Sequence, residues 1–355
     1  MEKENNNQNL DNSTQSTTGR EASSRTSYRL ENTNDKAHVS RVVPENKGSD
    51  SIPYKGDTSV AAEASEVLED DAVIVEPSSG QKASRLTRPQ LEKIEERLSA
   101  RDHAILQAIR KYRFLTSGQV GRLYVTNFSN KASQTRQQNL ILKRLADYGL
   151  IRPLDRRIGG IGGGSSVQVW HLTGAGHRLL TLNDPGKSKR KRFIEPSPTF
   201  LRHTLAVAEC AVQLTCICRN SMDLELIQVD TEPTCWRPYN SDGRIIQLKP
   251  DLFVITNYVD YEDRYFMEID LGTESVSQVV AKCDTYLDYY HTDIEQRESR
   301  MFPLVVWIVK DEDRKAKLKE AIKKAIVCQP KLFLVITPDE LERLIRQWIE
   351  PRDLL

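Results

Sequence analysis

The sequence predicts two folded domains of mixed helix and sheet, α+β followed by α/β, behind a disordered N-terminal arm. Residues 1–85 are rich in Asn, Ser, Thr, Glu and Lys and short of apolar clusters, so they cannot bury enough surface to order themselves. Residues 86–182 show helical periodicity that gives way to a β-hairpin pattern. Residues 199–355 alternate helices with short β-rich runs, and a chain of 355 residues has room for both domains.

The composition argues against a membrane protein and limits how nucleic acid can be bound. No window approaches the ~18 consecutive apolar residues of a membrane span, and the stretch Met1–Leu10 lacks the pattern of a signal peptide. The formal net charge is only +1, so affinity for nucleic acid must come from local basic patches. The six cysteines have no spacing typical of zinc sites. We expect a cytoplasmic protein with reduced thiols and no membrane partner.

The order of elements in residues 86–182 is typical of a winged helix-turn-helix. Three helices precede two strands that flank a glycine-rich tip, and Gly149 ends the third helix. The phrase from Leu142 to Ile151 is common in winged-helix repressors. The expected helices are Arg101–Tyr112, Thr116–Leu123 and Ser133–Tyr148, and the wing consists of Arg152–Arg157, the tip Gly159–Ser166 and Val167–Thr173.

The third helix of this domain is the expected reader of the DNA major groove. Its N-terminal half presents Gln134, Arg136 and Gln137, whose side chains can address base edges. Farther along, Lys143 and Arg144 suit phosphates. Basic residues outnumber acidic ones on this helix and wing, which is the electrostatic footprint of double-stranded DNA binding. They are Lys131, Arg136, Lys143, Arg144, Arg152, Arg156 and Arg157, against Asp147 and Asp155.

A basic linker, residues 183–198, joins the two expected domains. Its charges would add affinity for DNA without sequence preference and would hold a duplex near the second domain. A solubilising linker without DNA contacts is the alternative. The five cations lie within six residues and are Lys187, Lys189, Arg190, Lys191 and Arg192.

Three carboxylates converge in the second domain at one end of a predicted β-hairpin. The β-rich runs Leu248–Thr256 and Tyr265–Leu271 flank a polar stretch, and antiparallel pairing around it places Asp251 opposite Asp270. Because side chains alternate faces along a strand, Glu268 and Asp270 project together toward Asp251. Three crowded acids repel one another unless a cation lies among them. Mg²⁺ or Mn²⁺ prefers such oxygen ligands, so the pattern predicts a metal site.

Helices and strands surround this hairpin in the order of an α/β sheet. Gly272 ends the second strand of the hairpin. The helix that follows places Gln278, Lys282 and Tyr286 on one polar face. The apolar run Pro303–Val309 predicts a strand buried on both faces. The other expected elements are helices at Thr199–Cys218, Glu274–Tyr290, Asp311–Val327 and Pro338–Trp348, and strands at Leu224–Val229 and Leu332–Thr337.

This order, with an acid at the start of one strand and a glutamate on the next, resembles the PD-(D/E)xK nuclease superfamily. The resemblance implies that Asp251 and Glu268 hold the metal, with Asp270 completing the shell. Asp270 stands where the superfamily has its lysine, but some members carry that cation on the following helix. There Lys282 is available to orient or deprotonate the attacking water. Glu209 would correspond to the first-helix acid that some members add to the metal shell.

From Asp102 to Tyr290 the chain resembles the replication-relaxation family of plasmid and integrative-element proteins. The resemblance implies a role in replication or DNA relaxation of mobile elements, with other replication or relaxosome proteins as partners. The segments that carry it are the winged-helix region, Arg202–Leu205, Pro250–Asp251, Glu268–Glu274 and Tyr289–Tyr290.

Three functions are left open by the sequence. The first is a metal-dependent DNA endonuclease or nickase. The second is a non-catalytic replication initiator, relaxosome accessory protein or transcriptional regulator with a degenerate nuclease-like domain. The third is a tyrosine relaxase using Tyr286, Tyr289 or Tyr290, which is disfavoured because no two histidines flank a single apolar residue as its metal would require. A homodimer is left open as well, since no heptad run settles the oligomeric state.

Overall fold

The computed structural model describes residues 86–126, 128–155, 167–182, 193–259, 261–327 and 330–346. The expected N-terminal arm lies outside these residues. So do the wing tip with Arg156 and Arg157, and the basic stretch from Lys187 to Arg192. These three features remain predictions from the sequence.

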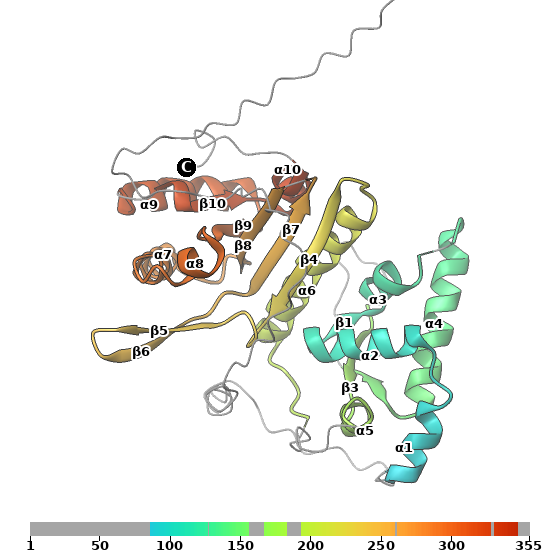
Figure 1. Cartoon of the computed structure of the whole chain (residues 1–355). Helices are drawn as coiled ribbons and strands as arrows, with labels where there is room; N and C mark the ends of the chain where they lie inside the picture. The colour runs from blue at the N-terminus through green and yellow to red at the C-terminus, as the bar shows by residue number, and fades with distance from the viewer. Residues whose placement is uncertain are drawn as a thin grey trace, which may run out of the picture. The chain divides into compact units, whose positions relative to one another are not determined.

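The described residues between 86 and 182 form helices around a small antiparallel sheet (Figure 1). The strand order is β1-β3-β2, with Leu115 opposite Trp170 and Ile151 opposite Leu172. The elements are α1 (Arg88–Glu95), α2 (Ala100–Tyr112), β1 (Leu115–Thr116), α3 (Ser117–Tyr124), α4 (Lys131–Asp147), β2 (Ile151–Pro153), β3 (Val169–Leu172) and α5 (Gly174–Leu179).

Side-chain caps set where the helices of this part begin and end. Ser99 and Asp102 form a capping box ahead of α2, and Thr116 and Gln119 form another ahead of α3. Gly149 follows α4 with φ of +70°, a left-handed conformation that favours glycine, and so ends the helix where the sequence predicts.

The described residues between 193 and 346 form a five-stranded mixed sheet with helices on both faces. The strand order is β10-β9-β8-β7-β4, antiparallel from β4 to β8 and parallel from β8 to β10. None of the helices in the described part of the chain is long and apolar enough to cross a membrane. The helices are α6 (Pro198–Arg219), α7 (Val276–Tyr290), α8 (Ile294–Ser299), α9 (Glu312–Ala325) and α10 (Leu341–Arg346), with 3-10 turns η3 (Pro330–Leu332) and η4 (Pro338–Glu340). The strands are β4 (Leu224–Thr231), β5 (Arg237–Ser241), β6 (Arg244–Leu248), β7 (Leu252–Tyr258), β8 (Tyr261–Asp270), β9 (Leu304–Val309) and β10 (Phe333–Ile336).

The alternation of side chains along β8 gives the sheet two buried faces. Tyr265 and Met267 pack into the apolar cluster that contains α6. Phe266 packs into the second cluster, with Tyr286 and other residues of α7 and α9. Figure 1 shows α7 and α9 together on one side of this sheet and α6 on the other. By the same alternation Glu268 belongs to the face covered by α7.

The strands β5 and β6 form a separate hairpin that the sequence analysis does not predict (Figure 1). Asp242 and Gly243 make its turn with φ of 51° and 76°, the conformation of a two-residue hairpin turn in which glycine is favoured. Tyr239 lies opposite Ile246, and these two side chains provide the partly apolar face of the hairpin.

The strands β7 and β8 pair as predicted, but in a different register. Leu252 lies opposite Met267 and Tyr258 opposite Tyr261, so the turn lies between these two tyrosines and not at the centre of the polar stretch that was expected to be the turn. Moving the centre of the hairpin by one residue shifts the pairing by two residues. Asp251 therefore lies level with Glu268, whereas the sequence interpretation placed it opposite Asp270.

Candidate functional site

Asp251 is positioned just before β7, within reach of α6 and of β8. Its side chain is buried, and Oδ1 lies 3.0 Å from Nε2 of His203 on α6. Oδ2 accepts a hydrogen bond of 2.7 Å from the backbone amide of Ile269 on β8. A helix and a neighbouring strand thus fix the orientation of this carboxylate.

Glu268 lies on β8 beneath α7 and is only 1% exposed. Lys282 Nζ donates a hydrogen bond of 2.6 Å to Oε2, and the hydroxyl of Tyr286 donates one of 2.6 Å to Oε1. The two donors are four residues apart, so they share one side of α7. The capping box of Ser275 and Gln278 starts this helix and sets its register over β8.

Burial and neighbouring charges set the ionisation of these groups. Burial raises the pKa of Glu268 to about 7, although the Lys282 ammonium opposes the rise. Burial lowers the pKa of Lys282, but the charges of Glu268 and Asp251 outweigh it, so the pKa is raised and the lysine stays protonated. Burial raises the pKa of Asp251, but the hydrogen bond and charge of His203, with the charge of Lys282, hold it below its ordinary value. The site therefore pairs Glu268 with a lysine ammonium and Asp251 with a histidine.

Asp270 and Glu209 do not join this group. Asp270 is buried, but Arg314 Nε on α9 lies 2.6 Å from its Oδ2. Glu209 on α6 accepts two hydrogen bonds from the Arg122 guanidinium and one of 3.1 Å from Gln119, both on α3. Within the described ranges no three or more Asp, Glu, His or Cys side chains are grouped so as to hold a metal ion. The shared centre of three or four carboxylates that the sequence predicts is therefore not formed, because distant arginines engage two of its members.

A comparison with protein families decides which group of proteins the chain is part of. A model described as replication-relaxation matches residues 106–305, more than half of the chain. The chain belongs to the replication-relaxation family. No curated protein and no solved structure was found to match it. The match includes Asp251, Glu268 and Lys282 as well as all of α4. Membership indicates a role in the replication or relaxation of plasmids or mobile elements.

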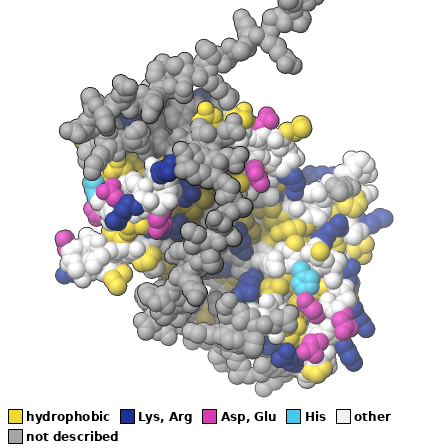
Figure 2. Space-filling model, in the orientation of Figure 1, with side chains coloured by type: hydrophobic (Ala, Val, Ile, Leu, Met, Phe, Trp, Pro, Cys, Tyr) yellow, Lys and Arg dark blue, Asp and Glu magenta, His cyan; other side chains and the backbone are white. Residues whose placement is uncertain are grey.

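In this replication-relaxation protein, α4 carries the candidate groups for reading DNA bases. Arg136 is exposed and Gln137 is half-buried. Figure 2 shows Lys and Arg side chains along the side of the molecule where α4 lies. Gln134 is engaged within the protein, because its amide donates a hydrogen bond of 2.6 Å to the carbonyl of Val125. Of the three predicted base readers, Arg136 is the exposed one, Gln137 is half-buried and Gln134 is hydrogen-bonded within the protein.

The two cations predicted to bind phosphates on α4 differ in their surroundings. Lys143 Nζ lies 2.7 Å from Asp147, and both side chains are largely exposed. Such a surface pair is worth little, so Lys143 can exchange its partner for a phosphate. Arg144 lies 2.5 Å from Asp102, which is buried, so its guanidinium is tied to the core.

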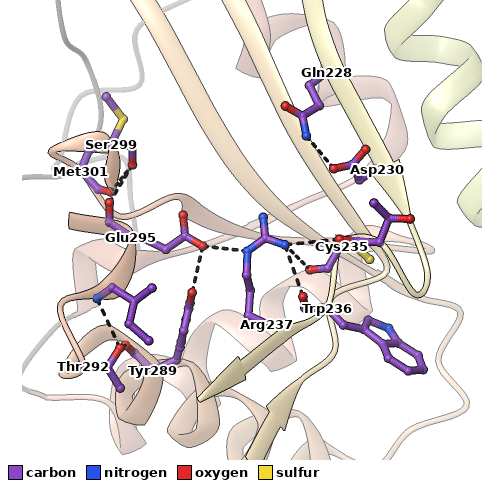
Figure 3. Close-up of polar contacts among 12 residues, drawn as sticks. Gln228, Asp230, Cys235, Trp236, Arg237, Tyr289, Thr292, Glu295, Ser299 and Met301 are labelled. Atoms are coloured by element: carbon purple, nitrogen blue, oxygen red, sulfur yellow. Dashed lines mark hydrogen bonds and ion pairs between the residues drawn. The ribbon is translucent and has the colours of Figure 1, made fainter. Parts of the chain in front are cut away.

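The tyrosines of α7 are buried and are not exposed nucleophiles, and two of them are partners of buried acids. Tyr286, Tyr289 and Tyr290 are at most 8% exposed. The hydroxyl of Tyr289 donates to Glu295 at 3.0 Å, and Arg237 Nε donates to the same oxygen at 2.8 Å (Figure 3). This network joins β5 to α7 and α8. The sequence does not predict this network, because its members come from three separate elements.

Proposed function

We propose that this replication-relaxation protein binds double-stranded DNA of a mobile element and hydrolyses one of its phosphodiester bonds. Residues 86–182 would act as a winged helix-turn-helix that selects the site, and residues 199–355 as a PD-(D/E)xK-like α/β domain. The observation that carries the hydrolytic role is the 2.6 Å contact of Lys282 with the buried Glu268, beside an ionised Asp251. Burying such charges is costly, and groups of this kind concentrate at functional sites.

Asp251 and Glu268 fit the donor set of Mg²⁺ or Mn²⁺. Proteins often bind Mg²⁺ through only one or two carboxylates and leave the remaining positions to water and substrate phosphates. The start of β7 and the neighbouring end of β8 provide two such carboxylates. A bound cation would polarise the phosphate and lower the pKa of a water molecule. His203 and the Ile269 amide would keep Asp251 oriented, as partners of metal ligands commonly do.

Lys282 would act as a hydrogen-bond donor and a positive charge. Its raised pKa keeps the ammonium protonated, so it is poorly suited to remove a proton from water. An ammonium in this place can donate a hydrogen bond to the attacking water or to a phosphate oxygen and stabilise the negative charge that develops there. Tyr286 would hold the other oxygen of Glu268 while Lys282 turns to the substrate.

The DNA-binding role is supported by the order α2, β1, α3, α4, β2, β3 and by the exposed face of α4. Arg136 and Gln137 would contact base edges in the major groove, and Lys143 would contact phosphates. The cations of the linker and the wing would add affinity that falls steeply with salt. They are Arg156, Arg157, Lys189, Arg190, Lys191 and Arg192.

Cleavage of supercoiled plasmid in the presence of Mg²⁺ or Mn²⁺ tests the hydrolytic role. We expect Asp251→Asn and Glu268→Gln to lower the rate by about 100-fold or more, since each removes a ligand and a charge that favour the transition state. Glu209→Gln is the matched control, because this acid lies on α6 but is bound by Arg122. The proposal fails if Asp251→Asn cleaves like the wild type or if cleavage needs no divalent cation.

A second candidate function is a non-catalytic replication initiator, relaxosome accessory protein or transcriptional regulator. One observation favours it: Asp251 and Glu268 already have His203 and Lys282 as hydrogen-bond partners, so the group has its polar contacts without a metal. In that case the domain would bind DNA or other replication proteins without cutting. Specific DNA binding by wild type, Asp251→Asn and Glu268→Gln alike, with intact plasmid under every cation condition, would support this alternative.

A further inference from the structure

A small cavity opens beside Asp251, between the end of α2 and the start of α6. Its walls include Lys111 and Arg113 at the end of α2, Phe200 and His203 from α6, and the acids Glu232 and Asp251. Its volume of about 40 Å³ admits a few water molecules or the oxygens of one phosphate, and no nucleobase. A nucleotide that sends its phosphate into this cavity must leave its base outside.

Phe200 provides an apolar surface at the rim where that base would lie. The side chain is 39% exposed although it is large and aromatic. It lies three residues before His203, so both share one side of α6. The Arg113 guanidinium lies 5.8 Å from the centre of the Phe200 ring. An exposed ring beside an arginine is the kind of platform on which single-stranded nucleic acids stack their bases.

The backbone at Lys111 and Arg113 is fixed in place, while the charged side chains of these residues remain accessible. Arg113 ends α2 with φ of 64°, a left-handed conformation that favours glycine and that fixes the direction in which the chain leaves the helix. Its ion pair with Glu232 is loose, with 3.8 Å between the charged atoms and about a third of each side chain exposed. The carbonyl of Lys111 accepts a hydrogen bond of 3.1 Å from Thr231, which fixes the end of α2 against β4.

We infer that this site takes DNA whose base next to the reacting phosphate is unpaired, with the phosphate near Arg113 and the base stacked on Phe200. The inference rests on the proposed hydrolytic role of Asp251 and Glu268. In an intact duplex each base is already stacked between its neighbours, so a base reaches an external ring only where the strand is single or the duplex is melted. The substrate class of this site is therefore single-stranded or locally melted DNA.

Binding of a fluorescent oligothymidylate to the full chain in EDTA tests the inference without any cleavage. Phe200→Ala should weaken binding about tenfold, the loss expected for one base stacked on an aromatic ring. Phe200→Tyr keeps an aromatic ring and should bind like the wild type. Phe128→Ala is the matched control, because it removes a ring of similar exposure, 40%, ahead of α4 and outside the cavity.

A photo-crosslink separates this inference from the hydrolytic proposal. A single-stranded oligonucleotide with one 5-iododeoxyuridine, irradiated in complex with the protein, should attach to the peptide that contains Phe200, as located by mass spectrometry. A crosslink at Phe200 without any plasmid cleavage would support the proposed site for an unpaired base and contradict only the proposed hydrolysis. A crosslink elsewhere, or equal oligothymidylate affinity for wild type and Phe200→Ala, would overturn the inference whether or not the protein cleaves plasmid DNA.

Discussion

The accessibility of the partner cation distinguishes Asp270 from Glu268, the acid that we propose to take part in hydrolysis. Asp270 is 1% exposed and its partner Arg314 is 11% exposed, so the pair is closed to solvent. Glu268 is equally buried, but its partner Lys282 is 30% exposed. An accessible ammonium can move from the carboxylate to a substrate, whereas a buried guanidinium stays where it is. Asp270 is therefore a structural residue, and Glu268 remains available to a ligand.

Arg314→Met tests the structural role of the Asp270 pair. The variant should lose about 3–5 kcal/mol of unfolding free energy, because Asp270 is left as a buried charge without its partner. Adding Asp270→Asn should recover much of that loss, since no charge then remains buried. Urea unfolding followed by circular dichroism measures both variants. A double variant no more stable than Arg314→Met alone would show that the ion pair is not the cause.

The sequence predicts the residues of the site whose positions follow from local patterns. Asp251 and Glu268 follow from strand alternation, and Lys282 follows from the helix that comes next. The partner of Asp270 could not be predicted in this way, because Arg314 lies 44 residues away on another helix. The same holds for the arginine that engages Glu209, which is 87 residues distant. Tertiary packing brings ion-pair partners to Asp270 and Glu209 that no local sequence pattern indicates.

At the scale of elements, helix caps and apolar periodicity predict where most of the helices and strands lie. The helix expected at Arg101–Tyr112 is found at Ala100–Tyr112, with its capping box one residue ahead. The hairpin β5–β6 escapes prediction because its short strands bury few side chains, and Ile245 is 81% exposed. Its Asp-Gly turn was the available signal. Missing two short strands leaves the order of the main sheet unaffected, since β5 and β6 pair only with each other.

The N-terminus of α2 should give the protein a measurable dependence on pH. Burial opposes ionisation of Asp102, but the amide and hydroxyl of Ser99 and the charge of Arg144 hold its pKa below the ordinary value. Because the folded pKa is lowered, the stabilisation is complete above the unfolded pKa of about 3.9 and is lost as pH falls through the folded pKa. Asp102→Asn should therefore cost about 1–3 kcal/mol at neutral pH, and the difference should shrink in acid.

Urea unfolding of wild type and Asp102→Asn between neutral and acidic pH measures this effect. Asp147→Asn serves as the control, because its pair with Lys143 is exposed and should change stability by less than about 1 kcal/mol. A stability difference for Asp102→Asn that stays constant with pH would contradict an ionised Asp102.

At the scale of the whole described chain, α6 belongs to both parts of the fold. Leu201 and Leu205 on its first turns pack with Phe114, Leu154 and Val169 from the N-terminal part. Residues farther along α6 line the core of the five-stranded sheet. The same helix also carries His203 and Phe200, so the element that joins the two parts orients the groups beside Asp251. Disturbing this contact should therefore affect the site as well as the stability.

The apolar contact of α6, and not its ion pair with α3, should hold the two parts together. Leu201 is 2% exposed, so Leu201→Ala leaves a cavity and should cost about 2–5 kcal/mol. Arg122 and Glu209 are each more than a third exposed, so Glu209→Gln should cost less than about 1 kcal/mol. Calorimetry should show Leu201→Ala unfolding in two steps, while Glu209→Gln unfolds like the wild type. The reverse order of the two effects would mean that charge, and not packing, couples the parts.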